Sequence, residues 1–434
     1  MAKINQLLIY IYIIFILIFF LEINTKEIFI HHNDDNFNYL QKVINENQYD
    51  TELIVRFEDD YYDMSKLLYS TEITVNTNIT LIGKSSGTTL DFKKDKKGRL
   101  SLNFLRTRGE KVQLINLNFI NFYVSKDLVG VQVITVISKS NNFLFIVDNC
   151  NFQDNNHVVF HFKTYCNKLS PIDTQFFITN SYFSKIEKSN YGDIVFYTSD
   201  ISSPLLIINN SIFEDINIKD KIPLIGCEGL TLENCHSDYG YLFNIYNQNF
   251  KKEYISIGDS TFQNTSTIIH GNYVKCNITN SRFKDMKIKN SIPAITDSKF
   301  SMFSIYNSEF YNLNISNILL GEESKYILEN IKLDSIKTNS KSLLYFIYNN
   351  IELKNIEADN ITCLGDSGDT SFILYDSGEI EKRLSIKNLH VRNSVTNGPL
   401  IKLIGKQNEF YIEHSEINDI YSYGSIIENL SKKV

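Results

Sequence analysis

The chain has 434 residues, of which 43% are hydrophobic and 21% are charged, so it can bury a large core and does not have the composition of a disordered protein. Its formal net charge of −7 argues against a DNA- or RNA-binding protein, because nucleic-acid binding needs a positive surface. Only 5 Pro and 18 Gly interrupt this length, which favours one uniform architecture over several domains joined by linkers.

The N-terminal segment has the pattern of a secretory signal. Lys3 is followed by an uncharged, apolar run over residues 7–21, and polar residues return at Glu22. A run of about 15 apolar residues suits a signal peptide, whereas a membrane-spanning helix usually needs about 20. We therefore predict a signal peptide at residues 1–25 and a secreted or cell-surface protein. The alternative is that this segment is retained as a membrane anchor.

Residues 26–70 predict a small N-terminal cap made of a short helix and a strand. Either Asp35 or Asn36 can cap the helix at its N-terminus. The apolar side of the helix consists of Phe37, Leu40, Val43 and Ile44. Apolar residues then alternate along the strand, at Leu53, Val55 and Phe57. A cap at this place would cover the exposed end of a repeat structure.

Twelve later segments align on one anchor position, which is Asn in ten of them and Asp259 or His414 in the other two. An aliphatic residue stands two positions before every anchor, and Phe stands three positions after seven of them. The ten asparagines are Asn116, Asn149, Asn180, Asn210, Asn234, Asn280, Asn307, Asn330, Asn355 and Asn388.

This repeat predicts an all-β solenoid over residues 71–430. Alternation before the anchor is typical of a strand with one buried face, and Asn suits the bend because it tolerates left-handed backbone angles. Its amide can also bond to an Asn stacked above it, which predicts an asparagine ladder. The anchors are about 27 residues apart, so we expect coils of three short strands and a rod of about 12 or more coils, roughly 55 to 60 Å long.

The inward aliphatic stacks, the asparagine ladder and the first coil at residues 79–83 and 87–91 resemble the pectin-lyase-like superfamily. The resemblance covers about residues 70–430 and implies a right-handed parallel β-helix. It leaves the activity open, because lyases, hydrolases, adhesins and non-catalytic repeat proteins share this fold.

The acids of the repeat do not form the set that a catalytic member would need. A calcium-dependent lyase requires stacked acids on neighbouring coils, together with a basic residue that takes the proton. The acids five residues after an anchor are never on neighbouring coils, and we interpret them as solvated turn residues: Asp154, Asp215, Asp285 and Asp419. Of the four motifs of the polygalacturonases, three are absent, and the Asp-Asp pairs lie in the predicted cap.

Other motifs favour structural roles. Residues 365–368 (Gly-Asp-Ser-Gly) are interpreted as a turn, and the basic run at residues 93–99 as a solvated turn that could alternatively contact an anionic polysaccharide. His31 and His32 could bind a metal only adventitiously. The six cysteines are too few for a disulfide framework, although Cys227 and Cys235 could form a bridge.

Seven Asn-x-Ser/Thr sequons could be glycosylated on a eukaryotic secretory route, although the Asn content alone predicts about as many by chance. They are Asn78, Asn209, Asn264, Asn277, Asn314, Asn360 and Asn429.

The sequence thus predicts an extracellular, non-catalytic binding or structural module that contacts a polysaccharide or a surface protein, with no catalytic residue, metal or cofactor. Outward residues available for such contacts are Phe177, Tyr306 and Tyr411. One alternative is an atypical polysaccharide lyase or glycoside hydrolase of the pectin-lyase fold, and another is a fragment of a longer adhesin. The enzyme would need several of the following residues gathered in one cleft: Asp148, Asp154, Lys185, Glu214 and Asp215.

Overall fold

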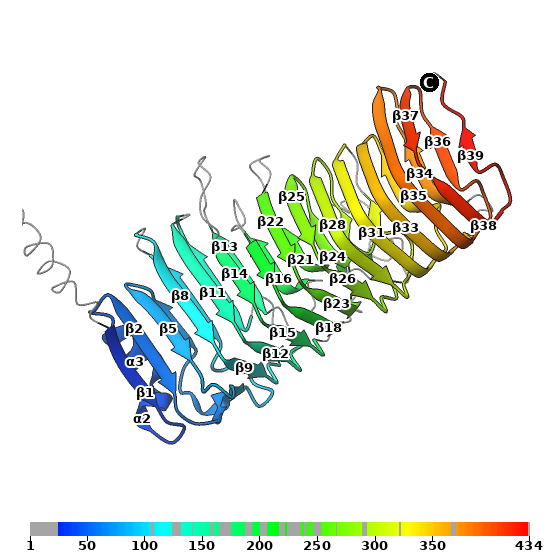
Figure 1. Cartoon of the computed structure of the whole chain (residues 1–434). Helices are drawn as coiled ribbons and strands as arrows, with labels where there is room; N and C mark the ends of the chain where they lie inside the picture. Colours follow the sequence, from blue (N-terminus) through cyan, green and yellow to red (C-terminus); the bar gives the residue numbers. More distant parts are fainter. Residues whose placement is uncertain are drawn as a thin grey trace, which may run out of the picture.

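The computed structural model describes residues 25–105, 108–123, 132–140, 142–156, 159–164, 175–186, 193–199, 206–216, 222–223, 236–237, 241–245, 253–265, 267–288, 293–320, 323–365 and 370–432. These residues form a long rod, with the cap helices at one end and the strands β37 to β39 at the other (Figure 1). The predicted signal peptide lies almost entirely outside them. In the described part of the chain, no helix is both long enough and apolar enough to cross a membrane.

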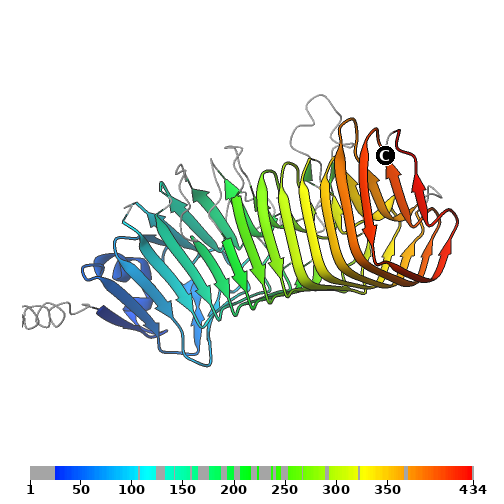
Figure 2. The same ribbon diagram turned by 45° about the horizontal axis from the view of Figure 1, so that its top comes forward.

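Strands stack in three columns, which we name the first, second and third faces of the rod (Figure 2). The first face contains β1 (Thr25–Ile30), β2 (Glu52–Phe57), β5 (Asn78–Ile82), β8 (Glu110–Ile115), β11 (Phe143–Asp148), β14 (Phe176–Thr179), β17 (Leu206–Asn209), β22 (Glu253–Gly258), β25 (Val274–Thr279) and β37 (Asn408–Glu413). The second face contains β3 (Tyr61–Asp63), β6 (Thr88–Asp91), β9 (Leu117–Ile120), β12 (Asn151–Gln153), β15 (Tyr182–Ser184), β18 (Ile212–Ile216), β23 (Thr261–Thr265), β26 (Arg282–Lys284) and β38 (Glu416–Ser422).

Four long strands bend from the first face onto the second: β28 (Met302–Tyr311), β31 (Lys325–Thr338), β33 (Asn350–Cys363) and β35 (Lys382–Thr396). The third face contains β4 (Thr71–Thr74), β7 (Leu100–Phe104), β10 (Ile134–Ser138), β13 (Phe160–Thr164), β16 (Asp193–Ser199), β21 (Tyr241–Ile245), β24 (Thr267–Gly271), β27 (Thr296–Asp297), β30 (Leu319–Leu320), β32 (Ser342–Ile347), β34 (Ser371–Asp376), β36 (Ile401–Ile404) and β39 (Ile427–Asn429). Short elements outside the three columns are η1 (Met64–Lys66), β19 (Ile222–Pro223), β20 (His236–Ser237) and β29 (Asn314–Ile315).

Every strand of the three faces pairs in parallel with its equivalent in the next coil, which confirms the predicted right-handed parallel β-helix. In the described part of the chain, the first face is fourteen strands deep. At about 4.8 Å per strand this depth corresponds to roughly 62 Å, slightly longer than expected from the sequence.

Two bends in each coil lie at the two ends of the second face. The first bend is formed by the anchors, and all eleven described anchors have a positive φ, from 45° at Asn210 to 57° at Asn330. A second set of positive-φ residues lies five positions after each of these anchors, at Asn121, Asp154, Lys185, Asp215, Asn264, Asp285, Asn312, Ser335, Asn360, Asn393 and Asp419. Asn and Asp dominate both sets because they tolerate the left-handed region better than other residues that have a Cβ.

The core is organised in columns of like residues along the rod axis. Seven phenylalanines of the second face form one continuous stack, with neighbouring ring centroids 4.7 to 5.1 Å apart. They are Phe119, Phe152, Phe183, Phe213, Phe262, Phe283 and Phe310. Each ring is at most 3% exposed, so this column contributes both apolar burial and aromatic stacking to stability.

A buried serine ladder lies beside this stack, directly after the anchors. The backbone N–H of Ser181 donates to Oγ of Ser211 at 3.3 Å, and Oγ of Ser181 donates to the carbonyl of Thr179 at 2.8 Å. The same pair of bonds recurs along the axis, so polar groups inside the bend are satisfied. The serines are Ser181, Ser211, Ser260, Ser281 and Ser308.

The sequence places a coil around Asn234, between those of Asn210 and Asp259, whereas the described part of the sheet pairs the strands of these two anchors directly. Strand β17 pairs with β14 on one side and with β22 on the other, in a register that joins Asn209 to Gly258. No further strand fits between β17 and β22, because both sides of β17 are already occupied. Asn234 itself lies outside the described residues, as do Cys227 and Cys235.

The cap differs in detail from the predicted single helix. Two short helices, α2 (Asp35–Asn38) and α3 (Leu40–Glu46), are separated at Tyr39. The N-cap residue of α2 is Asp34 rather than Asp35 or Asn36, and the Asp34 side chain makes no capping hydrogen bond. Phe37, Leu40 and Ile44 are buried.

Candidate functional site

The anchor asparagines bond to one another along the rod. Nδ2 of Asn149 donates to Oδ1 of Asn116 at 2.7 Å, and Nδ2 of Asn355 donates to Oδ1 of Asn330 at 2.6 Å. Equivalent bonds link Asn210 to Asn180, Asn307 to Asn280, Asn330 to Asn307, and Asn388 to Asn355. Asn180 and Asn280 donate instead to Asp148 and Asp259. These amides therefore act within the fold, and a ligand would have to compete for them.

The sequons all lie at surface or partly exposed positions. Asn78 and Asn277 are partly exposed, and the others are exposed: Asn209, Asn264, Asn314, Asn360 and Asn429. Asn264 and Asn360 belong to the second bend, where Nδ2 of Asn264 donates to Asp215 at 3.0 Å and Nδ2 of Asn360 donates to Ser335 at 3.2 Å. A glycan on either residue would have to be accommodated alongside this contact.

The structure aligns three of the residues that an enzyme would use. Asp154, Lys185 and Asp215 occupy the second bend on consecutive coils, and all three are exposed. Asp148 is on the first face, where it accepts the hydrogen bond from Asn180 at 2.8 Å. The aligned residues thus form a column on an outer bend, and they line neither the hollow beside the cap helices nor the groove across the last coils.

The start of the basic run at residues 93–99 is held by its neighbours. Nζ of Lys93 lies 3.1 Å from Asp91, and Tyr61 donates its hydroxyl to the same carboxylate at 3.0 Å. Hydrogen bonding to Tyr61 and Asp91 raises the pKa of Lys93, and burial raises the pKa of Tyr61. Both groups therefore keep their protons at neutral pH, which is the opposite of what a general base needs.

The cysteines and histidines offer no prepared reactive site in the described part of the chain. Cys150, Cys276 and Cys363 are buried free thiols, and burial raises the pKa of Cys150 and of Cys363 to about 12. Nδ1 of His31 is 3.9 Å from Asp59. Within the described residues, no three His, Cys, Asp or Glu side chains gather as metal ligands.

A charged groove of about 480 Å³ crosses the last coils of the second face, and we name it the C-terminal groove. Along the axis, the register places Lys332 beside Glu357, Glu357 beside His390, and His390 beside Glu416. A second row holds Asp359, to which Nε of Arg392 donates at 2.9 Å. Hydrogen bonds from Asn393, together with the Arg392 charge, lower the pKa of Asp359. Two of its groups, Asp359 and Arg392, are thus already paired with each other.

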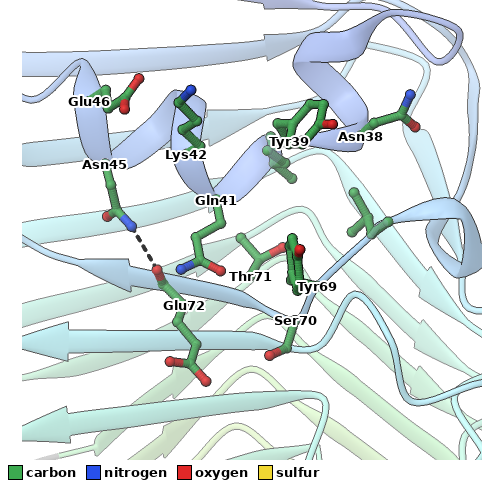
Figure 3. A pocket seen from close by; sticks show the side chains of 12 residues that line it. Asn38, Tyr39, Gln41, Lys42, Asn45, Glu46, Tyr69, Ser70, Thr71 and Glu72 are labelled. Atoms are coloured by element: carbon green, nitrogen blue, oxygen red, sulfur yellow. Dashed lines mark hydrogen bonds between the residues drawn. The ribbon is translucent and has the colours of Figure 1, made fainter.

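A larger hollow of about 660 Å³ lies between the cap helices and β4, and we name it the cap hollow. Figure 3 shows the side chains of Tyr39, Gln41 and Tyr69 around it. Its labelled lining residues are Asn38, Tyr39, Gln41, Lys42, Asn45, Glu46, Tyr69, Ser70, Thr71 and Glu72.

The wall of the cap hollow is fixed by hydrogen bonds between α3 and β4. Nδ2 of Asn45 donates to the carbonyl of Glu72 at 2.9 Å, and Oδ1 of Asn45 accepts from the backbone N–H of Thr74 at 3.0 Å (Figure 3 shows the first bond). Nε2 of Gln48 adds a bond to the carbonyl of Thr74 at 2.8 Å. The opposing sides of the hollow are therefore held at a set distance before any ligand arrives.

Several groups of the cap hollow are available to a ligand. Tyr39 is 45% exposed and Tyr69 is 70% exposed. Among the described residues, the side chains of Tyr39, Gln41 and Lys42 have no hydrogen-bond or ion-pair partner. The C-terminal groove is partly saturated by its own ion pairs, so the cap hollow is the better candidate site.

Sequence reasoning missed the cap hollow. Tyr39 and Tyr69 are thirty positions apart, and neither belongs to the repeat. One available signal was that Tyr39 and Lys42 fall between the apolar positions of the predicted cap helix and so point away from the core.

No protein-family model matches the chain, and no curated protein matches it either. Solved structures with a similar fold include the following three. A PL6 alginate lyase in complex with a trisaccharide is 12% identical, with a TM-score of 0.43 over 93% of this chain and 87% of that one. The surface protein and adhesin PfbA of Streptococcus pneumoniae is 12% identical, with a TM-score of 0.39 over 91% and 96%. The catalytic domain of a GH87 alpha-1,3-glucanase in complex with nigerose is 9% identical, with a TM-score of 0.30 over 94% and 68%. The likeness concerns the β-helical fold alone.

Proposed function

We propose that this chain is an extracellular binding module that holds a neutral glycan in the cap hollow. The observation that carries the proposal is an open hollow of about 660 Å³ with two exposed tyrosines and unpaired polar side chains on a fixed frame. Binding sites of this size usually combine apolar surface with a few convergent polar groups.

The chemistry of the lining suits a sugar. Tyrosine rings offer flat apolar surface for the C–H faces of a sugar ring, and their hydroxyls remain available to water or ligand. The Gln41 amide and the Lys42 ammonium can bond to sugar hydroxyls. Lys42 is outnumbered by Glu46 and Glu72, so the lining carries a net charge of −1 and disfavours a polyuronate.

The extracellular location is part of the proposal and rests on the apolar segment at residues 7–21 followed by polar sequence. Cleavage near residue 25 would release the rod with β1 at its start. Glycosylation of the exposed sequons would accompany secretion from a eukaryotic cell.

The test is secretion of the full chain from a eukaryotic host, followed by binding of the product to neutral glycans and to polyuronates. A double variant, Tyr39→Ala with Tyr69→Ala, should lower the affinity for the neutral glycan by at least about 10-fold, since each ring is worth about 1 kcal/mol. The matched control, Tyr411→Ala with Tyr423→Ala, removes two exposed tyrosines at the other end of the rod and should bind normally.

Three results would count against the proposal. The first is no glycan retained by the unchanged protein, and the second is equal loss in both double variants. The third is cleavage of a glycan that persists in the Tyr39→Ala and Tyr69→Ala variant, which would point to the enzyme alternative at another face. A loss confined to the control variant would favour the outward residues near Tyr411.

A further inference from the structure

A third bend returns each coil from the third face to the first face. On four consecutive coils the bend residue has left-handed backbone, with φ between 51° and 58°, and these residues are Tyr273, Phe300, Glu323 and Tyr348. The register of β25, β28, β31 and β33 aligns them along the axis. The other two bends use mainly Asn and Asp, whereas this stretch of the third bend has three aromatic residues.

Aromatic residues are costly at such a bend. A side chain with a Cβ is strained in left-handed backbone, and bulky residues are rare there. Within the described residues, every Phe or Tyr with a positive φ lies at the third bend. Burial does not offset this cost in full, because Phe300 is 38% exposed and Tyr348 is 39% exposed. Strained residues of this kind cluster at sites that hold ligands.

The two exposed rings are each supported on the side away from Glu323. The ring of Phe300 stacks on that of Tyr273, with centroids 5.1 Å apart and planes 15° apart. The ring of Tyr348 lies against Gly378, where an added Cβ would come within 2.3 Å of Cε1. Glu323 occupies the coil between them, and its exposed side chain has no hydrogen-bond or ion-pair partner among the described residues. We name Phe300, Glu323 and Tyr348 together the aromatic clamp.

The coil spacing sets the width of the aromatic clamp. Phe300 and Tyr348 are two coils apart, which corresponds to about 9.6 Å along the axis. A cation centred above Glu323 would therefore lie about 4.8 Å from each ring, within the roughly 6 Å over which an aromatic face attracts an ammonium group. Glu323 supplies the opposite charge. The nearest acid of the next coil on the first face, Glu352, is by contrast already paired with Lys325 at 3.0 Å.

We propose that the aromatic clamp binds a quaternary ammonium group, carried by a free small molecule or by a lipid headgroup. The rings of Phe300 and Tyr348 contact its methyl groups, and Glu323 neutralises its charge. A primary ammonium fits less well, because ring faces leave its N–H donors without conventional acceptors. The aromatic clamp lies on the coils of β28, β31 and β33, away from the cap helices (Figure 1), so the proposal is independent of glycan binding in the cap hollow.

The probe is choline chloride, titrated into the full secreted chain in a calorimeter. It is compared with the neutral tert-butyl analogue of choline, which has the same shape without the charge. Choline should bind with an affinity that falls as salt is added, and the neutral analogue should bind at least 10-fold more weakly. Retention on vesicles of phosphatidylcholine alone, competed away by free choline, would identify a headgroup as the source of the cation. Choline binding without vesicle retention would identify a free ligand.

Two variants test the residues of the aromatic clamp. Glu323→Gln should weaken choline binding at least 10-fold, and so should the double variant Phe300→Gly with Tyr348→Gly. Because Gly tolerates left-handed backbone, hydrogen exchange should show that β28 and β31 of the double variant remain folded. The matched controls, Glu309→Gln and Tyr311→Ala, change exposed groups of the second face and should bind choline normally.

Three results would overturn the proposal. The first is no saturable binding of choline, and the second is equal binding of the neutral analogue. The third is unchanged affinity in Glu323→Gln or in the folded double variant.

Discussion

Replacing Asn330 separates the two roles that the anchor asparagine plays at its bend. Its φ is 57°, its Nδ2 donates to Asn307 at 2.8 Å, and its Oδ1 accepts from Asn355 at 2.6 Å. Asn330→Ala removes both hydrogen bonds and also places a less tolerant residue in the left-handed region. Asn330→Gly removes the same bonds but leaves the backbone unstrained.

The magnitudes follow from these contacts. Two exposed side-chain bonds at the low end of their range contribute about 1 kcal/mol together. Left-handed backbone costs Ala about 1 to 2 kcal/mol, whereas Gly loses about 0.5 kcal/mol through the freedom of the unfolded chain. We expect a destabilisation of about 2 to 3 kcal/mol for Ala and about 1.5 kcal/mol for Gly. Asn277→Ala, on an extended outward position of β25, should cost less than about 0.5 kcal/mol.

The assay is native-state hydrogen exchange, because a repeat rod opens locally and a single global unfolding energy is not defined for it. The opening free energy is compared for amides of β31 and β33 in the two Asn330 variants, and for amides of β25 and β28 in Asn277→Ala. If Asn330→Gly is as damaging as Asn330→Ala, the left-handed backbone is not what selects Asn. If both variants match Asn277→Ala, neither the bend nor the ladder contributes measurably.

Three further expectations come from the core. Phe183→Ala, inside the phenylalanine stack, should lower the opening free energy of amides in β15 and β18 by about 3 to 5 kcal/mol in hydrogen exchange, whereas Phe29→Ala, at a half-exposed position, should change that of β1 and β2 little. Burial raises the pKa of Cys150 and of Cys363 to about 12. At pH 8 both thiols should therefore be alkylated on the order of 1,000-fold more slowly in the folded chain than in urea, as measured by site-resolved mass spectrometry. Equal alkylation rates would contradict their burial. Burial lowers the pKa of His161 to about 4, so below pH 6.5 the unfolded state binds a proton that the folded state does not. The opening free energy of the amides of β13 should therefore fall by up to about 3 kcal/mol as the pH is lowered from 6.5 to 4. In His161→Gln this part of the pH dependence should be missing.

The fold could be predicted because the sequence pattern that specifies it is local and repeated in each coil. Each coil carries its own alternating strand and its own bend residue, so every copy supports the same interpretation. The same local pattern does not report which strands pair with each other. Asn209 pairs with Gly258 across 49 positions, and nothing in the residues between them marks that distance.

The candidate site could not be predicted because it forms only where the cap helices pack against β4. Tyr39 and Tyr69 line one hollow only because Asn45 of α3 and Gln48, two residues after the helix, bond to β4, and neither tyrosine belongs to a motif. The second bend was noticed in the sequence only as scattered acids. In the structure, Asp215 and Asp285 accept hydrogen bonds from Asn264 and Asn312, so the pattern is one of left-handed backbone rather than of charge.

The columns of like residues make the length of this rod adjustable. Strands β31 and β33 are offset by 25 residues, and the ladder step from Asn330 to Asn355 has the same offset. Deleting residues 331–355 would join Asn330 directly to Ile356 and leave the anchor position followed by an aliphatic residue, as in the intact chain. Tandem duplication of such a unit would lengthen the rod by about 4.8 Å without a new core. Deletion or duplication of whole coils can therefore change the distance between the two ends of the molecule in small steps, while the surfaces at those ends stay the same.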